Sequence, residues 1–464
     1  MMTESPTHAV ANVAITRVQC RCMAPLRTIV ALLAFAAPLA AWQATDPVMQ
    51  RAVDHQKAHP TGDAAATFVQ ADYTGDLRTL PVGVFDSGVG GLTVLEALKT
   101  FDTHDNATGK SGADGVPDFA NERFVYFGDQ ANMPYGNYGT VGKTDFLREL
   151  VLKDAAFLLG RRWRANATSE PRMDKPPVKA IVIACNTATA YGLDDVRAAA
   201  KAWGIPVLTV GVVEAGARGV AETRGNNTGA VAVLATNATC ASNAYPKAIA
   251  RLMPNAPAVF QRGSGTLAAS IEGDATVKET PAQIIDAEVQ ALLSNRLASG
   301  DGTPIDTVVL GCTHYPLVKA DIVAAFDRIR TQTMPDGTTP CAKLIAPTLT
   351  VVDPAAWTAQ DLWRTLETAN LRMPVGAKPA AARDLFFISV ANPAWPSVQL
   401  SPDGTLTKDF KYGRDAGNPG REDTVIVPMT IECLPSSAAN LVKTRLPNTA
   451  ESMRNAAAPP PPSP

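Results

Sequence analysis

Two matched stretches most constrain what this chain can fold into. They are Ile-Val-Ile-Ala-Cys-Asn-Thr at residues 181–187 and Val-Val-Leu-Gly-Cys-Thr-His-Tyr at residues 308–315. Each is a run of apolar, mostly β-branched residues that ends in a small residue and a cysteine, which predicts a buried parallel strand with polar groups at its carboxyl end. Because open α/β sheets hold ligands at that edge, we expect a small ligand with one cysteine on either side.

The rest of the chain alternates between predicted strands and predicted helices, which is the pattern of a parallel sheet. It predicts an α/β fold with two pseudo-equivalent parallel-sheet domains, a site in the cleft between them and a C-terminal β-rich extension. The predicted strands are 81–85, 124–127, 206–210, 229–236, 257–260 and 307–311, and the predicted helices are 92–98, 144–159, 188–203, 242–252, 281–297 and 316–329.

The stripe of Leu147, Leu150, Val151 and Leu158 reads as core packing.

Composition shifts divide the chain further. The predicted segments are a signal peptide-like stretch at 1–44, a linker or N-terminal arm at 45–79, domain 1 at 80–215 plus 316–382, domain 2 at 216–315, an extension of unknown role at 383–455 and a disordered Pro-rich tail at 456–464.

The N-terminal stretch resembles a secretory signal peptide. A basic approach with Arg27 precedes an apolar run from Thr28 to Ala37 and an Ala-rich exit. The run is too short for a stable membrane span. Two other readings stay open, a start at Met23 with a shorter leader and an apolar segment without a targeting function. We therefore expect a periplasmic or secreted protein if the segment is used, and a cytoplasmic one otherwise.

Composition excludes several function classes. The chain has 42 basic and 44 acidic side chains, so nothing indicates a nucleic-acid partner. Seven cysteines in 464 residues do not make a disulfide framework, and the odd number leaves at least one thiol unpaired in a monomer. Cysteine chemistry is therefore the first hypothesis to examine.

A glycine-rich turn, Asp-Ser-Gly-Val-Gly-Gly at residues 86–91, joins the first predicted strand to its helix. Glycines let a ligand approach the backbone N–H groups, and the helix N-terminus attracts an anion. The spacing matches neither the dinucleotide pattern nor a phosphate-binding P-loop. The turn alone is equally compatible with an ordinary strand-to-helix connection.

Four blocks in a fixed order carry a resemblance to a known family. They are residues 84–94, Gly128-Asp129 with Pro134-Tyr135-Gly136, residues 185–188, and residues 311–317. With these blocks the chain resembles the glutamate racemases of the aspartate/glutamate racemase superfamily over about residues 80–366. The histidine that follows Cys-Thr in the last block favours the glutamate branch.

The resemblance implies a chemistry that needs two thiols. Racemisation takes a proton from a weak carbon acid and returns one to the opposite face, so two opposed bases serve it best. By resemblance, Cys185 acts on D-glutamate and Cys312 on L-glutamate, with Asp86 and His314 assisting, and no cofactor or metal is implied. A cysteine between a strand and a helix N-terminus is expected to have a lowered pKa. The alternatives are that Asp86 caps its helix and that His314 is structural.

The resemblance also implies a set of groups that hold the substrate's two carboxylates and its ammonium through backbone N–H groups and hydroxyls. Glu272 is the candidate for a further family acid. The threonines and Tyr135 are alternatively ordinary turn residues. The expected substrate-binding residues are Asp86, Ser87, Tyr135, Gly136, Asn186, Thr187, Thr236, Thr239, Thr313 and His314.

The expected function is interconversion of L- and D-glutamate, which supplies D-glutamate for peptidoglycan. The alternatives are a racemase of aspartate or another amino acid, and an exported amino-acid-binding protein without turnover. Binding alone requires neither thiol, so the two cysteines favour an enzyme. The sequence leaves the oligomeric state open, with a homodimer as one arrangement.

Overall fold

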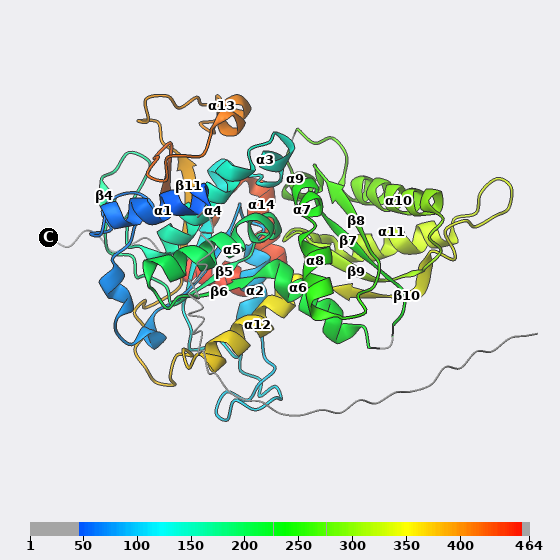
Figure 1. Ribbon diagram of the computed structural model, residues 1–464, viewed down its shortest axis with the longest axis horizontal. Coiled ribbons are helices and arrows are strands. Elements are labelled where there is room, and N and C mark those ends of the chain that lie inside the picture. The colour runs from blue at the N-terminus through cyan, green and yellow to red at the C-terminus, as the bar shows by residue number, and fades with distance from the viewer. Residues whose placement is uncertain (1–45, 226, 275, 457–464) are drawn as a thin grey trace, which may run out of the picture. The chain divides into compact units, whose positions relative to one another are not determined.

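The computed structural model describes residues 46–225, 227–274 and 276–456, and these described residues belong to one compact unit. The predicted signal segment and the Pro-rich tail beyond Ala456 lie outside the described residues. The described chain is built around two large sheets with helices on both faces (Figure 1). The α/β class expected from the sequence is confirmed. No helix among the described residues is long and apolar enough to cross a bilayer.

The first sheet has six strands in the order β12-β11-β2-β1-β5-β6, and all neighbours are parallel except β11 and β12. Its central strands are apolar and buried along their whole length, because helices cover both faces. The strands are β1 (Val82–Asp86), β2 (Phe124–Gly128), β5 (Ala180–Ile183), β6 (Leu208–Gly211), β11 (Leu385–Ala391) and β12 (Thr424–Pro428).

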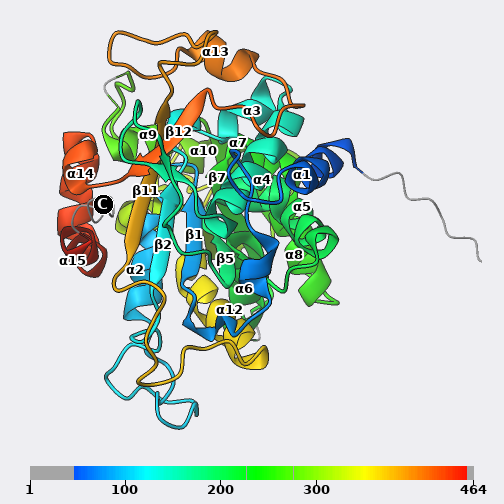
Figure 2. The same ribbon diagram turned by 90° about the vertical axis from the view of Figure 1, so that its left-hand side faces the viewer.

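Helices from distant parts of the chain cover this sheet (Figure 2). One apolar core lies between the sheet and α1, α4 and α5, and the other lies between the sheet and α2, α12, α14 and α15. The bounds are α1 (Pro47–Ala58), α2 (Leu92–Thr100), α4 (Thr144–Leu159), α5 (Asn186–Trp203), α12 (Pro354–Thr368), α14 (Ser436–Arg445) and α15 (Pro447–Asn455).

Helix α1 lies in the segment that we predicted to be a linker or N-terminal arm. Asp46 caps its first turn, and its buried residues include Val48, Ala52 and Gln56. Gln56 exchanges two hydrogen bonds with the backbone of Phe68, at 2.7 and 2.9 Å. The segment is therefore a packed helical arm, held by tertiary contacts that a short amphipathic pattern does not reveal.

The second sheet has four parallel strands in the order β10-β9-β7-β8. Helices α6 and α8 cover one face, and α9, α10 and α11 cover the other. The bounds are β7 (Ala230–Thr236), β8 (Val259–Ser264), β9 (Ile305–Gly311), β10 (Ile345–Val352), α6 (Val212–Thr223), α8 (Ala244–Leu252), α9 (Leu267–Glu272), α10 (Pro281–Ser299) and α11 (Lys319–Thr331).

Strand β10 and helix α11 belong to this second sheet, although we predicted residues 316–382 to lie in domain 1. The physical reason is that β10 pairs in parallel with β9, and the buried face of α11 packs on the same sheet. Later in that range, α12 packs against the first sheet. The other predicted domain bounds stay predictions.

The predicted C-terminal extension is integral to the first sheet. Strand β11 pairs in parallel with β2, because its buried residues Phe386, Phe387 and Ile388 complete the two apolar cores of that sheet. The smaller elements are α3 (Gly136–Thr140), α7 (Asn237–Ser242), α13 (Lys408–Gly413), the hairpin of β3 (Trp163–Arg164) and β4 (Pro171–Arg172), and the 3-10 turns Gln70–Tyr73, Leu77–Thr79, Gln130–Asn132, Tyr315–Val318 and Ile431–Cys433.

Candidate active site

The two cysteine turns come together at one pocket. Cys185 follows β5 of the first sheet and Cys312 follows β9 of the second, and each thiol-bearing residue is 6% exposed. The pocket measures about 30 Å³. Its lining residues are Ser87, Met133, Pro134, Tyr135, Gly136, Cys185, Asn186, Thr187, Thr236, Ala268, Cys312, Thr313 and His314.

Cys185 occupies the N-cap position of α5. Its sulfur accepts a hydrogen bond from the N–H of Ala188 at 3.4 Å, and its thiol donates to Ser87 Oγ at 3.7 Å. Burial, followed by the nearby charge of Asp86, nevertheless raises the pKa of the Cys185 thiol well above its usual value. This direction is opposite to the lowered pKa that we expected from the helix N-terminus, and it favours the thiol form of Cys185.

Asp86 lies at the end of β1, fully buried behind Ser87. Burial raises its pKa to about 6, although the charge of His314 and the N–H groups of Gly91 and Gly88 oppose this. The Gly88 N–H donates to Asp86 Oδ2 at 3.1 Å, while Oδ1 has no hydrogen-bond partner among the described groups. A carboxyl with this pKa can take up or release a proton near neutral pH.

Cys312, His314 and Glu272 form a linked series on the opposite wall. His314 Nδ1 is 3.7 Å from the Cys312 sulfur, and His314 Nε2 is 2.7 Å from Glu272 Oε1. Burial alone would lower the pKa of His314, but the hydrogen bonds to Cys312 and Glu272 raise that pKa well above its usual value. The imidazole is therefore a cation that donates to the carboxylate on one side and to the sulfur on the other.

The glycine-rich turn packs directly on this series. A Cβ atom at Gly90 would overlap the His314 ring and the Thr313 hydroxyl. The carbonyl of Thr313 also accepts a hydrogen bond from Thr93 Oγ1 at 2.9 Å, which ties the second cysteine turn to α2 of the first sheet. Close backbone approach, rather than phosphate binding, explains the glycine at position 90.

Three threonine hydroxyls meet at the rim. Thr187 Oγ1 lies 3.0 Å from Thr236 Oγ1 and 3.1 Å from Thr239 Oγ1, and the last two are 3.0 Å apart. Asn186 Oδ1 accepts from Tyr245 at 2.7 Å, which leaves the buried Nδ2 without a partner among the described groups. Thr187, Thr236 and Asn186 line the pocket and can face an acidic ligand, whereas Thr239 is fully buried and is not among the lining residues.

Tyr135 and Gly136 also line the pocket, but the Tyr135 hydroxyl is already engaged. It lies 2.5 Å from Asp129 Oδ2 and 2.7 Å from Asp154 Oδ2, so it cannot also bind a ligand. Sequence reasoning missed Asp154, because it lies on α4 within a stripe that reads as core packing. A charged residue in a buried helical stripe was the available signal.

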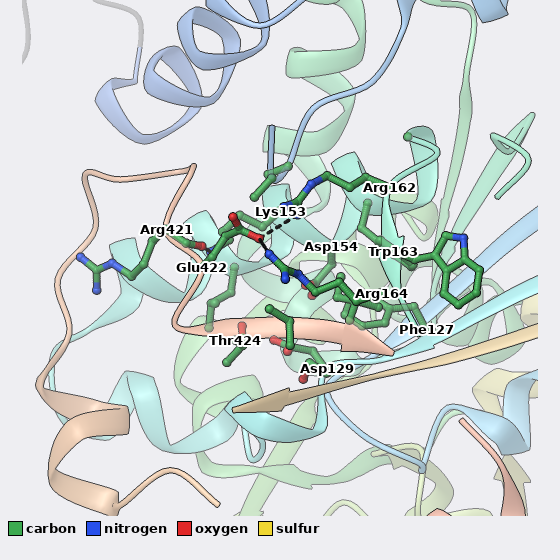
Figure 3. Close-up of a pocket in the computed structure, with 18 of the residues that line it drawn as sticks. Phe127, Asp129, Lys153, Asp154, Arg162, Trp163, Arg164, Arg421, Glu422 and Thr424 are labelled. Carbon is green, nitrogen blue, oxygen red and sulfur yellow. Dashed lines mark hydrogen bonds and ion pairs between the residues drawn. The ribbon is translucent and has the colours of Figure 1, made fainter. Parts of the chain in front are cut away.

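A second cavity, of about 60 Å³, lies beside this acid pair (Figure 3). Its lining includes Asp129, Asp154 and Lys153, whose ammonium donates to the carbonyl of Arg421 at 2.7 Å. Burial lowers the pKa of Lys153. Glu422 closes the cavity with ion pairs to two arginines of the β3 region, Arg162 at 2.7 Å and Arg164 at 3.5 Å.

Comparisons with known proteins show similarity to one family. The model of the Asp/Glu/Hydantoin racemase family matches residues 164–357. A glutamate racemase of Limosilactobacillus fermentum is 31% identical over 275 residues, which are 59% of this chain and 76% of that protein. A glutamate racemase of Chlorobium phaeobacteroides is 34% identical over 249 residues, which are 53% of this chain and 72% of that protein.

Among solved structures, a glutamate racemase isoform from Bacillus anthracis is 25% identical, with 67% of this chain and 89% of that chain covered and a TM-score of 0.45. A glutamate racemase of Francisella tularensis in complex with D-glutamate is 25% identical, with 74% and 96% covered and a TM-score of 0.45. On the strength of its sequence relatives, the chain belongs to the glutamate racemase family and is an amino-acid racemase.

Proposed function

We propose that the chain interconverts L- and D-glutamate with Cys185 and Cys312 as the two bases. The observation that carries this proposal is that two thiols from different sheets line one pocket, each with its own polar partners. Because β5 and β9 belong to different sheets, a ligand bound between the two cysteines would meet one sulfur on each face. A site that only binds an amino acid needs neither sulfur.

The protonation states favour a defined starting form. Cys185 is a thiol because its pKa is raised, and the Cys312 sulfur lies 3.7 Å from Nδ1 of the His314 imidazole. The Cys312 thiolate removes the α-proton of L-glutamate, and the Cys185 thiol gives its proton to the opposite face of the same carbon. The product is D-glutamate, and the two sulfurs have exchanged protonation states.

Asp86 and water then restore the starting form. Asp86, whose pKa is about 6, can pass a proton toward Cys185 and regain one from water, while Cys312 gives up its proton to water as the product leaves. The His314 imidazolium does not accept that proton, because each of its nitrogens already carries one, and it assists by holding the Cys312 sulfur from Nδ1. Catalysis in the D-to-L direction starts from the exchanged form without this step.

The substrate would be held mainly by neutral donors. No lysine or arginine is among the described residues that line the pocket. The partnerless Nδ2 of Asn186, the hydroxyls of Thr187 and Thr236 and backbone N–H groups would supply hydrogen bonds to two carboxylates at a modest desolvation cost. Because the cavity is only about 30 Å³, its two walls must separate before an amino acid enters.

Solvent-deuterium incorporation at Cα tests the function. We expect incorporation and inversion with either glutamate enantiomer, and much slower reaction with aspartate. Cys185→Ser and Cys312→Ser should each abolish inversion, whereas Cys240→Ser, which removes a thiol outside the pocket, should not. Near-normal rates in either pocket variant would refute the two-thiol mechanism. Tight glutamate binding without any exchange would show a binding protein.

The cellular role belongs to the same proposal. D-glutamate made by this enzyme would serve peptidoglycan synthesis, and the signal-like N-terminal segment would direct export. Sequencing the N-terminus of the mature protein tests export, since an intact Met1 or Met23 in the soluble fraction would contradict it. A strain that depends on this gene for D-glutamate should need external D-glutamate when the gene is silenced.

A further inference from the structure

Residues 408–414, which comprise α13 and Arg414, lie against the loop that carries Tyr135. They are called the α13 segment below. Helices α13 and α3 are neighbours in both views (Figures 1 and 2). Lys411 Nζ donates to the carbonyl of Met133 at 2.6 Å, and Asn137 Nδ2 donates to the Tyr412 hydroxyl at 3.1 Å. Met133 lines the candidate active site, so this segment reaches the pocket wall from outside.

Arg414, at the end of the α13 segment, has a buried side chain. Its side chain is 4% exposed and pairs with Asp423, which is 2% exposed, at 3.1 Å. The same guanidinium donates to Asn132 Oδ1 at 2.5 Å and to the Tyr138 hydroxyl at 3.1 Å. It also lies over the Phe146 ring. A buried charge with this many partners is held in one orientation.

Arg414 determines how Asn132 is oriented. A guanidinium only donates hydrogen bonds, so the oxygen of the Asn132 amide must face it. The amide nitrogen then faces Asp129, and it donates to both carboxylate oxygens at 2.9 Å. Asp129 in turn contacts the Tyr135 hydroxyl at 2.5 Å. An unbroken series of hydrogen bonds therefore runs from Arg414 to a residue of the active-site wall.

A proton count defines the end of the series. The Tyr135 hydroxyl has one proton but lies within hydrogen-bond distance of two carboxyl oxygens, on Asp129 and Asp154. One carboxyl must therefore be protonated. Asp129 already accepts two hydrogen bonds from Asn132, and burial raises the pKa of Asp154 well above its usual value. By this count Asp154 donates to Tyr135, and Tyr135 donates to Asp129.

We propose that Arg414, through Asn132 and Asp129, is a positioning residue that holds the Tyr135–Gly136 wall of the active site for racemisation. The proposal rests on the proposed function and adds a residue from a segment beyond the resemblance at residues 80–366. Without the guanidinium, the Asn132 amide can turn over and the Asp129 carboxylate loses its only route to a positive charge in this series. The wall then samples several positions, and substrate binding weakens.

The first test compares Arg414→Met with Arg414→Lys and with Arg445→Met, which removes an exposed arginine on α14 of the same C-terminal region. We expect Arg414→Met to raise the KM for glutamate about 10-fold or more, with a smaller change in kcat. Arg414→Lys should raise the KM less than Arg414→Met does, because it keeps a charged hydrogen-bond donor at this position. Arg445→Met should behave as wild type. An unchanged KM in a folded Arg414→Met protein would overturn the proposal.

Amide hydrogen exchange of residues 130–138 gives a readout that does not depend on substrate. Arg414→Met should speed exchange in this loop, while exchange in β1 and β5 stays as in wild type. If the wild-type protein does not act on glutamate but the loop loosens, the proposed function fails and the positioning role stands. If the loop keeps its protection, the positioning role fails.

A second variant covers the case in which Arg414→Met does not fold. Lys411→Met removes the hydrogen bond to the Met133 carbonyl from a partly exposed position on α13. We expect a smaller rise in KM, of about 3-fold, together with faster amide exchange at Asn132 and Met133. Wild-type KM and wild-type exchange in this variant would overturn the claim that the segment holds the wall.

Discussion

Asp86→Asn should stabilise the fold while it damages the activity. Asp86 is fully buried, one of its oxygens lacks a partner, and its pKa is raised from 3.8 to about 6. A raised carboxyl pKa means that the folded state holds the proton more tightly than the unfolded state. The stabilising contribution of protonated Asp86 is therefore fully present below pH 3.8 and is lost as the pH rises through 6. The total loss is about 3 kcal/mol at 1.36 kcal/mol per pKa unit.

The assay is urea unfolding of wild type and Asp86→Asn at pH 5 and pH 8. About 1.4 kcal/mol of the loss falls between these two pH values, so the stability advantage of the variant should grow by that amount. Asp194→Asn, which changes an exposed carboxyl on α5, is the control and should show no such growth. Racemisation by Asp86→Asn should fall in both directions. An advantage that is the same at pH 5 and pH 8 would refute the reasoning, since the buried charge would then cost nothing.

Two further predictions concern other buried ionisable groups. Glu272→Gln removes the carboxylate that helps to raise the pKa of His314, so the high-pH limb of the kcat/KM profile for L-glutamate should move to lower pH; a profile identical to wild type would contradict this role. Glu122→Gln leaves Lys179 buried without its carboxylate at 2.7 Å and should lower the free energy of unfolding by about 3–5 kcal/mol, measured by urea denaturation. Glu122→Leu with Lys179→Met should cost less than the single change, and an equal or larger cost would argue against the uncompensated charge as the cause.

Much of the fold could be predicted because its signals are local. Buried parallel strands are continuous apolar runs, and the runs that end at Cys185 and Cys312 are interior strands of the two sheets. The polar residues directly after these strands must lie at the carboxyl edge, which is why both thiols meet at one pocket. Glu272 was harder to place from sequence, and the fold brings it to 2.7 Å from His314.

Other features depend on contacts between distant segments. Strand β11 adds to β2 from more than 250 residues away, and β10 joins β9 rather than the first sheet. Arg414 reads as one more arginine in a turn-rich stretch, and only packing brings it against Asn132. The raised pKa of Cys185 also depends on distant segments. The burial that they cause raises this pKa by more than the nearby helix N-terminus lowers it.

The amino-acid sequence by itself determined the strand ends, the residue types at those ends and hence the kind of chemistry available, because strand periodicity and turn composition are short-range properties. Tertiary structure alone decided which groups are deprived of water and which carboxyl carries a proton. Those outcomes depend on how many atoms from remote segments surround each group, and no local pattern in the chain records that number.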